Sequence, residues 1–297
     1  MDHLSAQLIA SGLNTVFLGR NLLYLPETTS THAEAKRLAR KGAPEGLLVV
    51  ADHQTAGRGR LDRRWEAPAG SSLLLSIVFR PALEPSQIQQ VTMSCGLAVV
   101  DALAGQTGLD VGLKWPNDII LAGAKLGGIL TEIEFTGHRI EHMVVGIGLN
   151  VNLDPAQLSS ALLWPATSLS QALGRHVPRL PLLWALLEAV EARYTALQAG
   201  PSPRAEWAER LATLGQAVVV SGAGVMLEGV AEGVDEDGAL LVRVAGGGLE
   251  RILVGDVSLR NAVDWHRPET SAIIRPAAEG DTGSRENGGK GRCGGLD

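Results

Sequence analysis

Four arginines and two glycines share one short stretch of this sequence, directly after an apolar run. The stretch is residues 52–65 (DHQTAGRGRLDRRW), and the run before it is residues 47–51 (LLVVA). Glycines let the backbone approach a ligand closely, and their amides can donate to it. Arginine side chains present paired donors that match carboxylate and phosphate oxygens. The pattern indicates an anion-binding loop, with a solvated basic loop or a patch for nucleic-acid phosphates as the alternatives.

The composition narrows these alternatives. The chain has 297 residues, 45% of them hydrophobic, and a formal net charge of −6, which disfavours general affinity for nucleic acid. Clustered arginines on an acidic protein therefore favour one specific anion. Cys95 and Cys293 are too few for a disulfide framework or a zinc site. The N-terminus lacks a signal-peptide pattern and no apolar run reaches about 18 residues, so we expect a soluble cytoplasmic protein without a membrane partner.

Two further segments carry polar groups at suggestive places. A hydroxyl-rich turn at 27–32 precedes a predicted helix at 33–41, so Ser30 or Thr31 should cap that helix while the other faces a ligand. Residues 111–121 (VGLKWPNDIIL) and 125–132 (KLGGILTE) flank a short glycine turn. A hairpin there would bring Asp118 and Lys125 near the same end of neighbouring strands.

The pattern of elements predicts an α+β fold, with a mixed, mainly antiparallel sheet and helices on one face. A buried strand is expected at 71–80 and a long helix at 85–103, with Ser86 and Gln89 as a capping box. From residue 216, short strands separated by glycines suggest a small SH3-like β-barrel. We therefore expect domains at 1–214 and 215–263. The tail at 264–297 should be disordered because it has almost no large apolar side chains.

Two catalytic patterns are rejected on their context. Residues 138–142 (HRIEH) match an inverted zinc-protease string, but that chemistry needs a helix and the segment continues into a strand-like run. The pair Gly146 and Gly148 lacks the third glycine and following helix of a dinucleotide fingerprint, and there is no Walker string. We expect no protein-held metal, and any nucleotide must be bound in another way.

Four strings together resemble the biotin protein ligases. They are GRGR (57–60) followed by Arg63 and Trp65, KWPND (114–118), KLGGI (125–129) and GIGLN (146–150), in the family's order and spacing. The resemblance runs from about Leu22 to Arg260 and closes with GDVSLR (255–260). It implies the fold shared by class II synthetases and biotin–lipoate ligases, with residues 1–214 as the biotin- and ATP-binding catalytic domain.

The resemblance also implies a two-step reaction. The biotin carboxylate attacks the α-phosphate of ATP to give biotinyl-5′-AMP and pyrophosphate, with Mg²⁺ on the phosphates. A lysine on the biotin carboxyl carrier domain of a carboxylase then attacks the activated carbonyl and releases AMP. The first step brings a carboxylate and a triphosphate together against their repulsion, and charge-assisted hydrogen bonds from fixed cations suit that task.

Roles carry over by position. Lys125 would bridge the biotin carboxylate and the α-phosphate, Asp118 would orient or deprotonate the incoming amine, and Arg58 would assist catalysis. The implied biotin contacts are Ser30, Thr31, His32, Gln54, Arg58, Gly59, Arg60 and Lys125. The implied ATP contacts are Arg58, Arg63, Trp65, Asn117 and Asn150. Two plainer interpretations remain, a core tryptophan for Trp65 and a sheet-edge charge for Lys114.

Some features depart from the family pattern. His32 stands where many members have Asn, and Asp62 stands where many have Gly, which would stiffen the loop. About 20 residues before the first strand are too few for a helix-turn-helix domain, so a ligase without a repressor role is expected. A lipoate or octanoate ligase or transferase of the same fold, and a non-enzymatic RNA-binding protein, are the alternatives. The sequence does not decide between a monomer and a homodimer.

Overall fold

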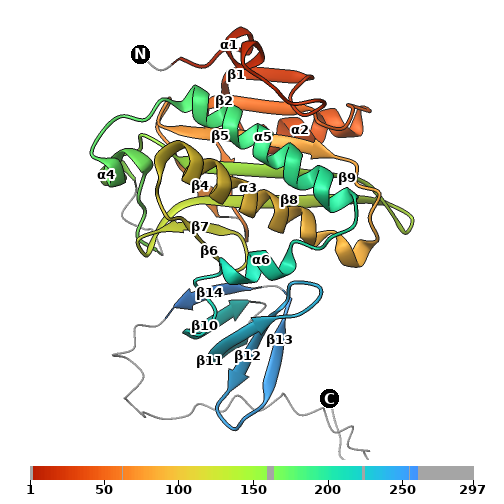
Figure 1. Cartoon of the computed structure of the whole chain (residues 1–297), viewed down its shortest axis with the longest axis vertical. Coiled ribbons are helices and arrows are strands. Elements are labelled where there is room, and N and C mark those ends of the chain that lie inside the picture. The colour runs from red at the N-terminus through yellow and green to blue at the C-terminus, as the bar shows by residue number, and fades with distance from the viewer. Residues whose placement is uncertain (1–2, 62, 159–163, 223–224, 254, 260–297) are drawn as a thin grey trace, which may run out of the picture.

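A seven-stranded sheet forms the centre of the larger part of the molecule (Figure 1). The computed structural model describes residues 3–61, 63–158, 164–222, 225–253 and 255–259. Only β1 and β2 pair in parallel, and the other neighbours are antiparallel, so the predicted α+β fold with a mainly antiparallel sheet is confirmed. In spatial order the strands are β1 (Leu22–Thr28), β2 (Leu48–Gln54), β5 (Ser72–Phe79), β9 (Arg139–Asn150), β8 (Ala124–Thr136), β7 (Asp118–Leu121) and β6 (Gly112–Lys114).

Both faces of this sheet are covered by helices. Alternate strand side chains, such as Leu48 and Val50, pack with α3 (Gln89–Thr107) and α5 (Arg179–Gln198) in the main core. The opposite set, including Val49, packs with α2 (Thr31–Arg40) in a second core. The prediction of helices on one face is therefore wrong for α2. Residues 48–51 of β2 are apolar at every position, and such a strand needs cover on both sides.

The long helix α3 belongs to the core. Together with the turn before it (Pro85–Thr107), it is long and apolar enough to cross a membrane, yet 72% of its most apolar window is buried inside the protein. Its predicted capping box is displaced. The 3₁₀ turn η1 (Pro85–Gln87) precedes α3, and the Glu84 amide donates to Gln87 Oε1 at 3.2 Å in place of a Ser86–Gln89 box.

The remaining helices are short and lie around the sheet. These elements are α1 (Ala6–Ser11), η2 (Pro155–Gln157), α4 (Leu169–Leu173) and α6 (Arg204–Glu209). Helix α6 ends at Glu209, and the chain after it bonds along β6, where the Leu113 amide donates to the Arg210 carbonyl and the Ala212 amide donates to the Leu113 carbonyl, both at 2.9 Å.

A second, five-stranded antiparallel sheet follows α6 and lies below the large sheet in Figure 1. Trp115, fully buried, joins the two parts by donating from Nε1 to the Gly238 carbonyl at 3.0 Å. The domain limits at 214/215 and 263/264 stay predictions, and Asp62 and the tail at 264–297 lie outside the described residues. The strands are β13 (Leu249–Ile252), β12 (Leu240–Val244), β11 (Val225–Val234), β10 (Ala217–Gly222) and β14 (Asp256–Leu259).

Candidate active site

One pocket gathers the predicted site residues from five separate parts of the chain. All the predicted residues except Asn150 line it. The predicted residues in the lining are Ser30, Thr31, His32, Gln54, Arg58, Gly59, Arg60, Arg63, Trp65, Asn117, Asp118 and Lys125. Others were missed by sequence reasoning, among them Ser76, Gly128, Gly146, Gly148 and Asp256.

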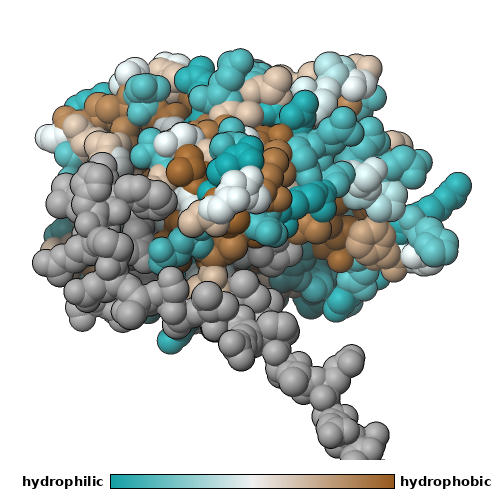
Figure 2. All heavy atoms as spheres, turned by 90° about the horizontal axis from the view of Figure 1, so that it is seen from below, coloured by the Kyte–Doolittle hydropathy of each residue, from teal (hydrophilic) through white to brown (hydrophobic). Residues whose placement is uncertain are grey.

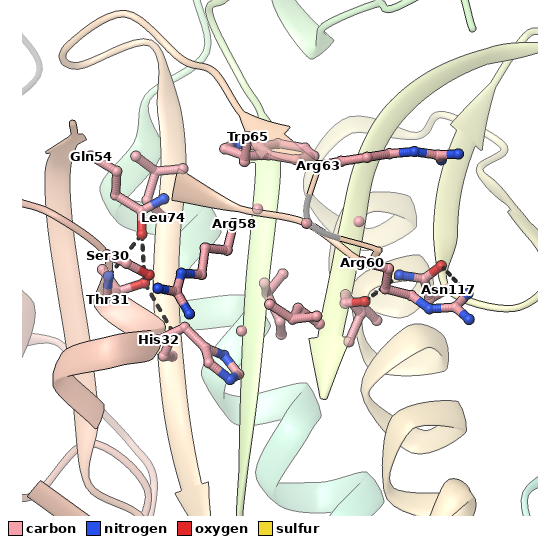
Figure 3. Close-up of a pocket in the computed structure, with 18 of the residues that line it drawn as sticks. Ser30, Thr31, His32, Gln54, Arg58, Arg60, Arg63, Trp65, Leu74 and Asn117 are labelled. Atoms are coloured by element: carbon pink, nitrogen blue, oxygen red, sulfur yellow. Dashed lines mark hydrogen bonds between the residues drawn. The ribbon is translucent and has the colours of Figure 1, made fainter. Parts of the chain in front are cut away.

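The arginine-rich loop folds as a small hairpin, here called the Arg hairpin (residues 57–65, Asp62 outside the description). Its strands β3 (Gly57–Arg58) and β4 (Arg64–Trp65) pair, and the Gly59 amide donates to the Arg63 carbonyl at 2.7 Å. A Cβ at Gly57 would lie 2.5 Å from the Trp65 carbonyl oxygen, so this close pairing needs glycine. Arg58 extends from the hairpin toward His32 (Figure 3).

The polar end of the pocket is built at the start of α2. The Ser30 hydroxyl caps the helix by accepting from the Ala33 amide at 3.4 Å, as predicted for one of the two hydroxyls. Thr31 donates to Gln54 Oε1 from its amide at 2.8 Å and from its hydroxyl at 3.1 Å. The Thr31 hydroxyl also lies 2.9 Å from the Ser76 hydroxyl (Figure 3). This network fixes the orientation of the Gln54 amide at the pocket wall.

His32 lies beside this network as a neutral side chain. Burial lowers its pKa to about 4, against the opposing charge of Glu132 and with smaller contributions from Lys36 and Arg58. Its Nε2 is 3.6 Å from Glu132 Oε1, and neither ring nitrogen has a hydrogen-bond partner within the described part of the chain. A neutral imidazole offers one donor and one acceptor. His32 can therefore donate one hydrogen bond to a ligand and accept another, as the side-chain amide of an Asn at this position would.

Asp118 lies between two lysines at the centre of the site. Lys125 Nζ donates to Asp118 Oδ1, and Lys114 Nζ lies 3.5 Å from Asp118 Oδ2. The predicted proximity of Asp118 and Lys125 is thus confirmed. Lys114 is on the edge strand β6, as expected, with its Nζ 5.1 Å from the centroid of the Trp164 ring, and burial lowers its pKa despite the opposing charge of Asp118.

The arginines of the hairpin tip face the other end of the pocket. Arg60 Nη1 donates to Asn117 Oδ1 at 3.3 Å, and Arg63 forms an ion pair with Asp256 (Figure 3 shows Arg60 and Asn117). Burial lowers the pKa of Arg60, with Asp256 and Asp118 opposing that effect. Asp256 comes from β14 of the small sheet. The string GDVSLR, quoted above for the resemblance, was the only sequence signal for it.

Trp65 lies flat against glycines of β8 and β9. A Cβ on Gly148 would be 2.7 Å from Trp65 Cε2, and one on Gly128 would be 3.6 Å from Cζ3. Lys125 Nζ is 5.9 Å from the ring centroid, within cation–π range. The indole N–H is buried without a hydrogen-bond partner in the described region. The ring therefore contributes a pocket wall as well as packing.

Asn150 is set apart from the other predicted residues. It is buried at the end of β9, and its Nδ2 donates to the Thr167 carbonyl at 3.0 Å. The structure thus gives it a role in holding the segment after η2. Its contact with ATP stays a prediction.

The rejected HRIEH string is indeed not helical. His138 is in a turn and His142 is buried on strand β9, where burial lowers its pKa. The two histidines therefore do not share a helix face. No group of three or more metal-binding side chains occurs among the residues described here.

Comparisons with known proteins agree with this geometry. Residues 24–150 match the Biotin/lipoate A/B protein ligase family, and residues 213–260 match the Biotin protein ligase C terminal domain. The bifunctional ligase/repressor BirA of Bacillus subtilis (strain 168) is 36% identical over 258 residues, covering 86% of this chain and 79% of the relative. The biotin–[acetyl-CoA-carboxylase] ligase of Mycobacterium tuberculosis is 36% identical over 246 residues, covering 80% and 88%.

A solved structure extends the likeness to three dimensions. The biotin protein ligase from Aquifex aeolicus in complex with biotin and ATP has a TM-score of 0.67 and 29% identity. The match covers 82% of this chain and 100% of that one.

Proposed function

The chain belongs to the biotin protein ligase family, and on that premise we propose that it joins biotin to a lysine of a biotin carboxyl carrier domain at the expense of ATP. The observation that carries this proposal is the single pocket in which the hydroxyl turn, the Arg hairpin and the KWPND and KLGGI segments meet. The pocket combines neutral polar groups, on Ser30, Thr31, His32 and Gln54, with the cations of Arg58, Arg60, Arg63 and Lys125. That polarity suits a ligand with an uncharged ring system and a carboxylate that must meet a phosphate.

In the first step, a biotin carboxylate oxygen bonds to the α-phosphorus of ATP, and the bond to the bridging oxygen breaks to release pyrophosphate. We assign the ring contacts to Thr31, His32 and Gln54, whose polar groups face the pocket. Lys125 exchanges its bond to Asp118 for contacts with the carboxylate and the α-phosphate. The lysine is then the fixed cation that offsets their repulsion and the charge developing in the transition state.

The Arg hairpin encloses the intermediate. Arg58, Gly59 and Arg60 cover biotin and its adenylate, while Arg63, Trp65 and Asn117 contact the phosphates and the adenosine. Excluding water from this chamber protects a mixed anhydride that would otherwise hydrolyse. Support for these assignments comes from the lining of the pocket and from the flat stack of Trp65 on Gly148.

In the second step, the acceptor amine attacks the biotinyl carbonyl carbon, and the bond from that carbon to the AMP oxygen breaks. Asp118 accepts the amine proton or orients the nitrogen. Lys114, held 3.5 Å from Oδ2, keeps the carboxylate in place when Lys125 moves to the substrate. AMP then leaves with the electron pair of the broken bond on its phosphate oxygen.

We expect Mg²⁺ to arrive as part of the substrate, bound to the ATP phosphates. Magnesium in such sites is usually held by one or two carboxylates together with phosphates and water. The two carboxylates of the pocket, Asp118 and Asp256, are both paired with cations. The Mg²⁺ requirement, the carrier partner, the homodimer and a cytoplasmic location stay predictions.

The first experiment is biotin-dependent pyrophosphate release by the purified chain with ATP and Mg²⁺. We expect a burst of about one pyrophosphate per protein with biotin, and then transfer to a biotin carboxyl carrier domain. Lipoate serves as the control acid, since the matching family model covers lipoate ligases as well. A burst with lipoate and none with biotin would overturn the proposed substrate.

A further inference from the structure

The small C-terminal sheet reaches into the pocket through one carboxylate. Asp256, at the start of β14, lines the pocket and pairs with Arg63 of the Arg hairpin. Its side chain is 19% exposed and that of Arg63 is 47% exposed. The charge of Asp256 also acts on Arg60, three residues earlier in the hairpin. One acidic group of the C-terminal sheet thus faces two cations at the hairpin tip.

Asp256 is held firmly in this position. The β14 strand pairs with β10, with Ser221 opposite Asp256 itself. The sheet is in turn fixed to the larger part of the molecule by Trp115, whose Nε1 donates to the Gly238 carbonyl and whose amide donates to the Thr213 hydroxyl at 2.9 Å. Trp115 immediately precedes the Pro116–Asn117–Asp118 segment. The carboxylate is therefore a fixed point, whereas the hairpin it contacts projects from the sheet on two short strands.

We propose that Asp256 is a positioning residue that ties the tip of the Arg hairpin to the C-terminal sheet and keeps the hairpin closed over the pocket. The C-terminal sheet is then part of the lid of the active site. Asp256 acts through Arg63 and Arg60 and takes no part in bond making. Its effect on the intermediate rests on the proposed function, but its effect on the hairpin does not.

The primary test uses limited trypsin digestion of the full chain without substrates, with fragments identified by mass spectrometry. The hairpin carries trypsin sites at Arg58, Arg60, Arg63 and Arg64, and Asp256→Asn leaves all of them unchanged. We expect this substitution to raise the rate of cleavage within the hairpin about two- to fivefold, as for loss of one partly exposed ion pair. The difference should shrink in about 1 M salt, where such pairs are screened.

Two variants serve as controls. Asp256→Glu keeps the charge and should restore slow cleavage. Glu232→Gln removes the partner of Arg243, an exposed ion pair of the same sheet away from the pocket, and should leave hairpin cleavage unchanged. Equal cleavage of wild type and Asp256→Asn at low salt would overturn the proposal, as would equal acceleration by Glu232→Gln.

The second readout is retention of biotinyl-AMP. After loading with biotin and ATP, the Asp256→Asn variant should release the adenylate about two- to fivefold faster than wild type, again with the difference reduced by salt. Faster cleavage with unchanged adenylate release would overturn the role in closure. Failure of the wild type to form an adenylate would count against the proposed function, while the cleavage result would still decide the hairpin contact.

Discussion

Gly148→Ala should damage the site through a single methyl group. Gly148 is on β9, beneath the ring of Trp65. The new Cβ would lie 2.7 Å from Trp65 Cε2 and 2.8 Å from Cζ2. Carbon atoms in contact are about 3.5–4.0 Å apart, so the indole would have to move by roughly 1 Å. Such overpacking costs about 1–3 kcal/mol of unfolding free energy.

The consequence for activity should exceed the consequence for stability. Trp65 is the last residue of the Arg hairpin, and its ring faces Lys125 at 5.9 Å. Displacing it by about 1 Å should misplace the adenosine site and lower the efficiency of adenylate formation by about 100-fold, mainly through a higher KM for ATP. The assays are biotin-dependent ATP–pyrophosphate exchange and urea unfolding. Gly233→Ala on β11 is the matched control, since nothing lies within 4 Å of its added Cβ.

A double-mutant cycle decides whether the clash is the cause. In a Trp65→Ala background the methyl group at position 148 has no ring to displace. The stability cost of Gly148→Ala should then fall to about 0.5 kcal/mol or less, which is a clear departure from additivity. The reasoning would be refuted if Gly148→Ala cost as much unfolding free energy in the Trp65→Ala background as in the wild type. An unchanged KM for ATP in the Gly148→Ala variant would refute it as well.

Three further predictions concern ionisable groups. Lys125→Ala should slow single-turnover pyrophosphate release at least about 100-fold, because it removes the proposed transition-state cation, while exposed Lys41→Ala should not. Asp52→Ala should lower the unfolding free energy in urea by about 3 kcal/mol, because Asp52 pairs at 2.8 Å with Arg179, which is 1% exposed; a loss under 1 kcal/mol would contradict this. The pKa of His32 is lowered to about 4, so its contribution to stability is complete above pH 6.5 and is lost as pH falls toward 4, where the unfolded chain binds the proton first. His32→Asn should therefore flatten the decline in stability between pH 6.5 and pH 4, and an unchanged slope would contradict the assignment.

Local sequence patterns predicted the local structure well. The glycine turn before Lys125 brought that residue to Asp118, and the turn at Ser30 and Thr31 capped α2 as expected. These features depend on neighbours within a few residues, so residue type and spacing specify them directly. Where a predicted helix cap differs from the observed one, the difference is only a few residues. The capping box predicted at Ser86 and Gln89, for example, is found at Glu84 and Gln87.

Which face each helix covers was decided by tertiary packing. Nothing local assigns α2 to the side opposite α3 and α5. The choice follows from burying a strand, β2, that is apolar on both sides. Asn150, a predicted ATP contact, donates to the Thr167 carbonyl, a bond that only the tertiary structure shows.

From the sequence by itself, the residue types around Arg58 indicated an anion-binding loop, and the resemblance of four strings to the biotin protein ligases implied a reaction that joins a carboxylate to a phosphate. Only the tertiary structure decided the partners of those groups. Asp256 lies almost 200 residues after Arg63 in the chain, and no local pattern pairs them. Their contact exists because the C-terminal sheet docks on Trp115 and places Asp256, the first residue of β14, against the hairpin. Long-range contacts of this kind depend on how buried surfaces fit together.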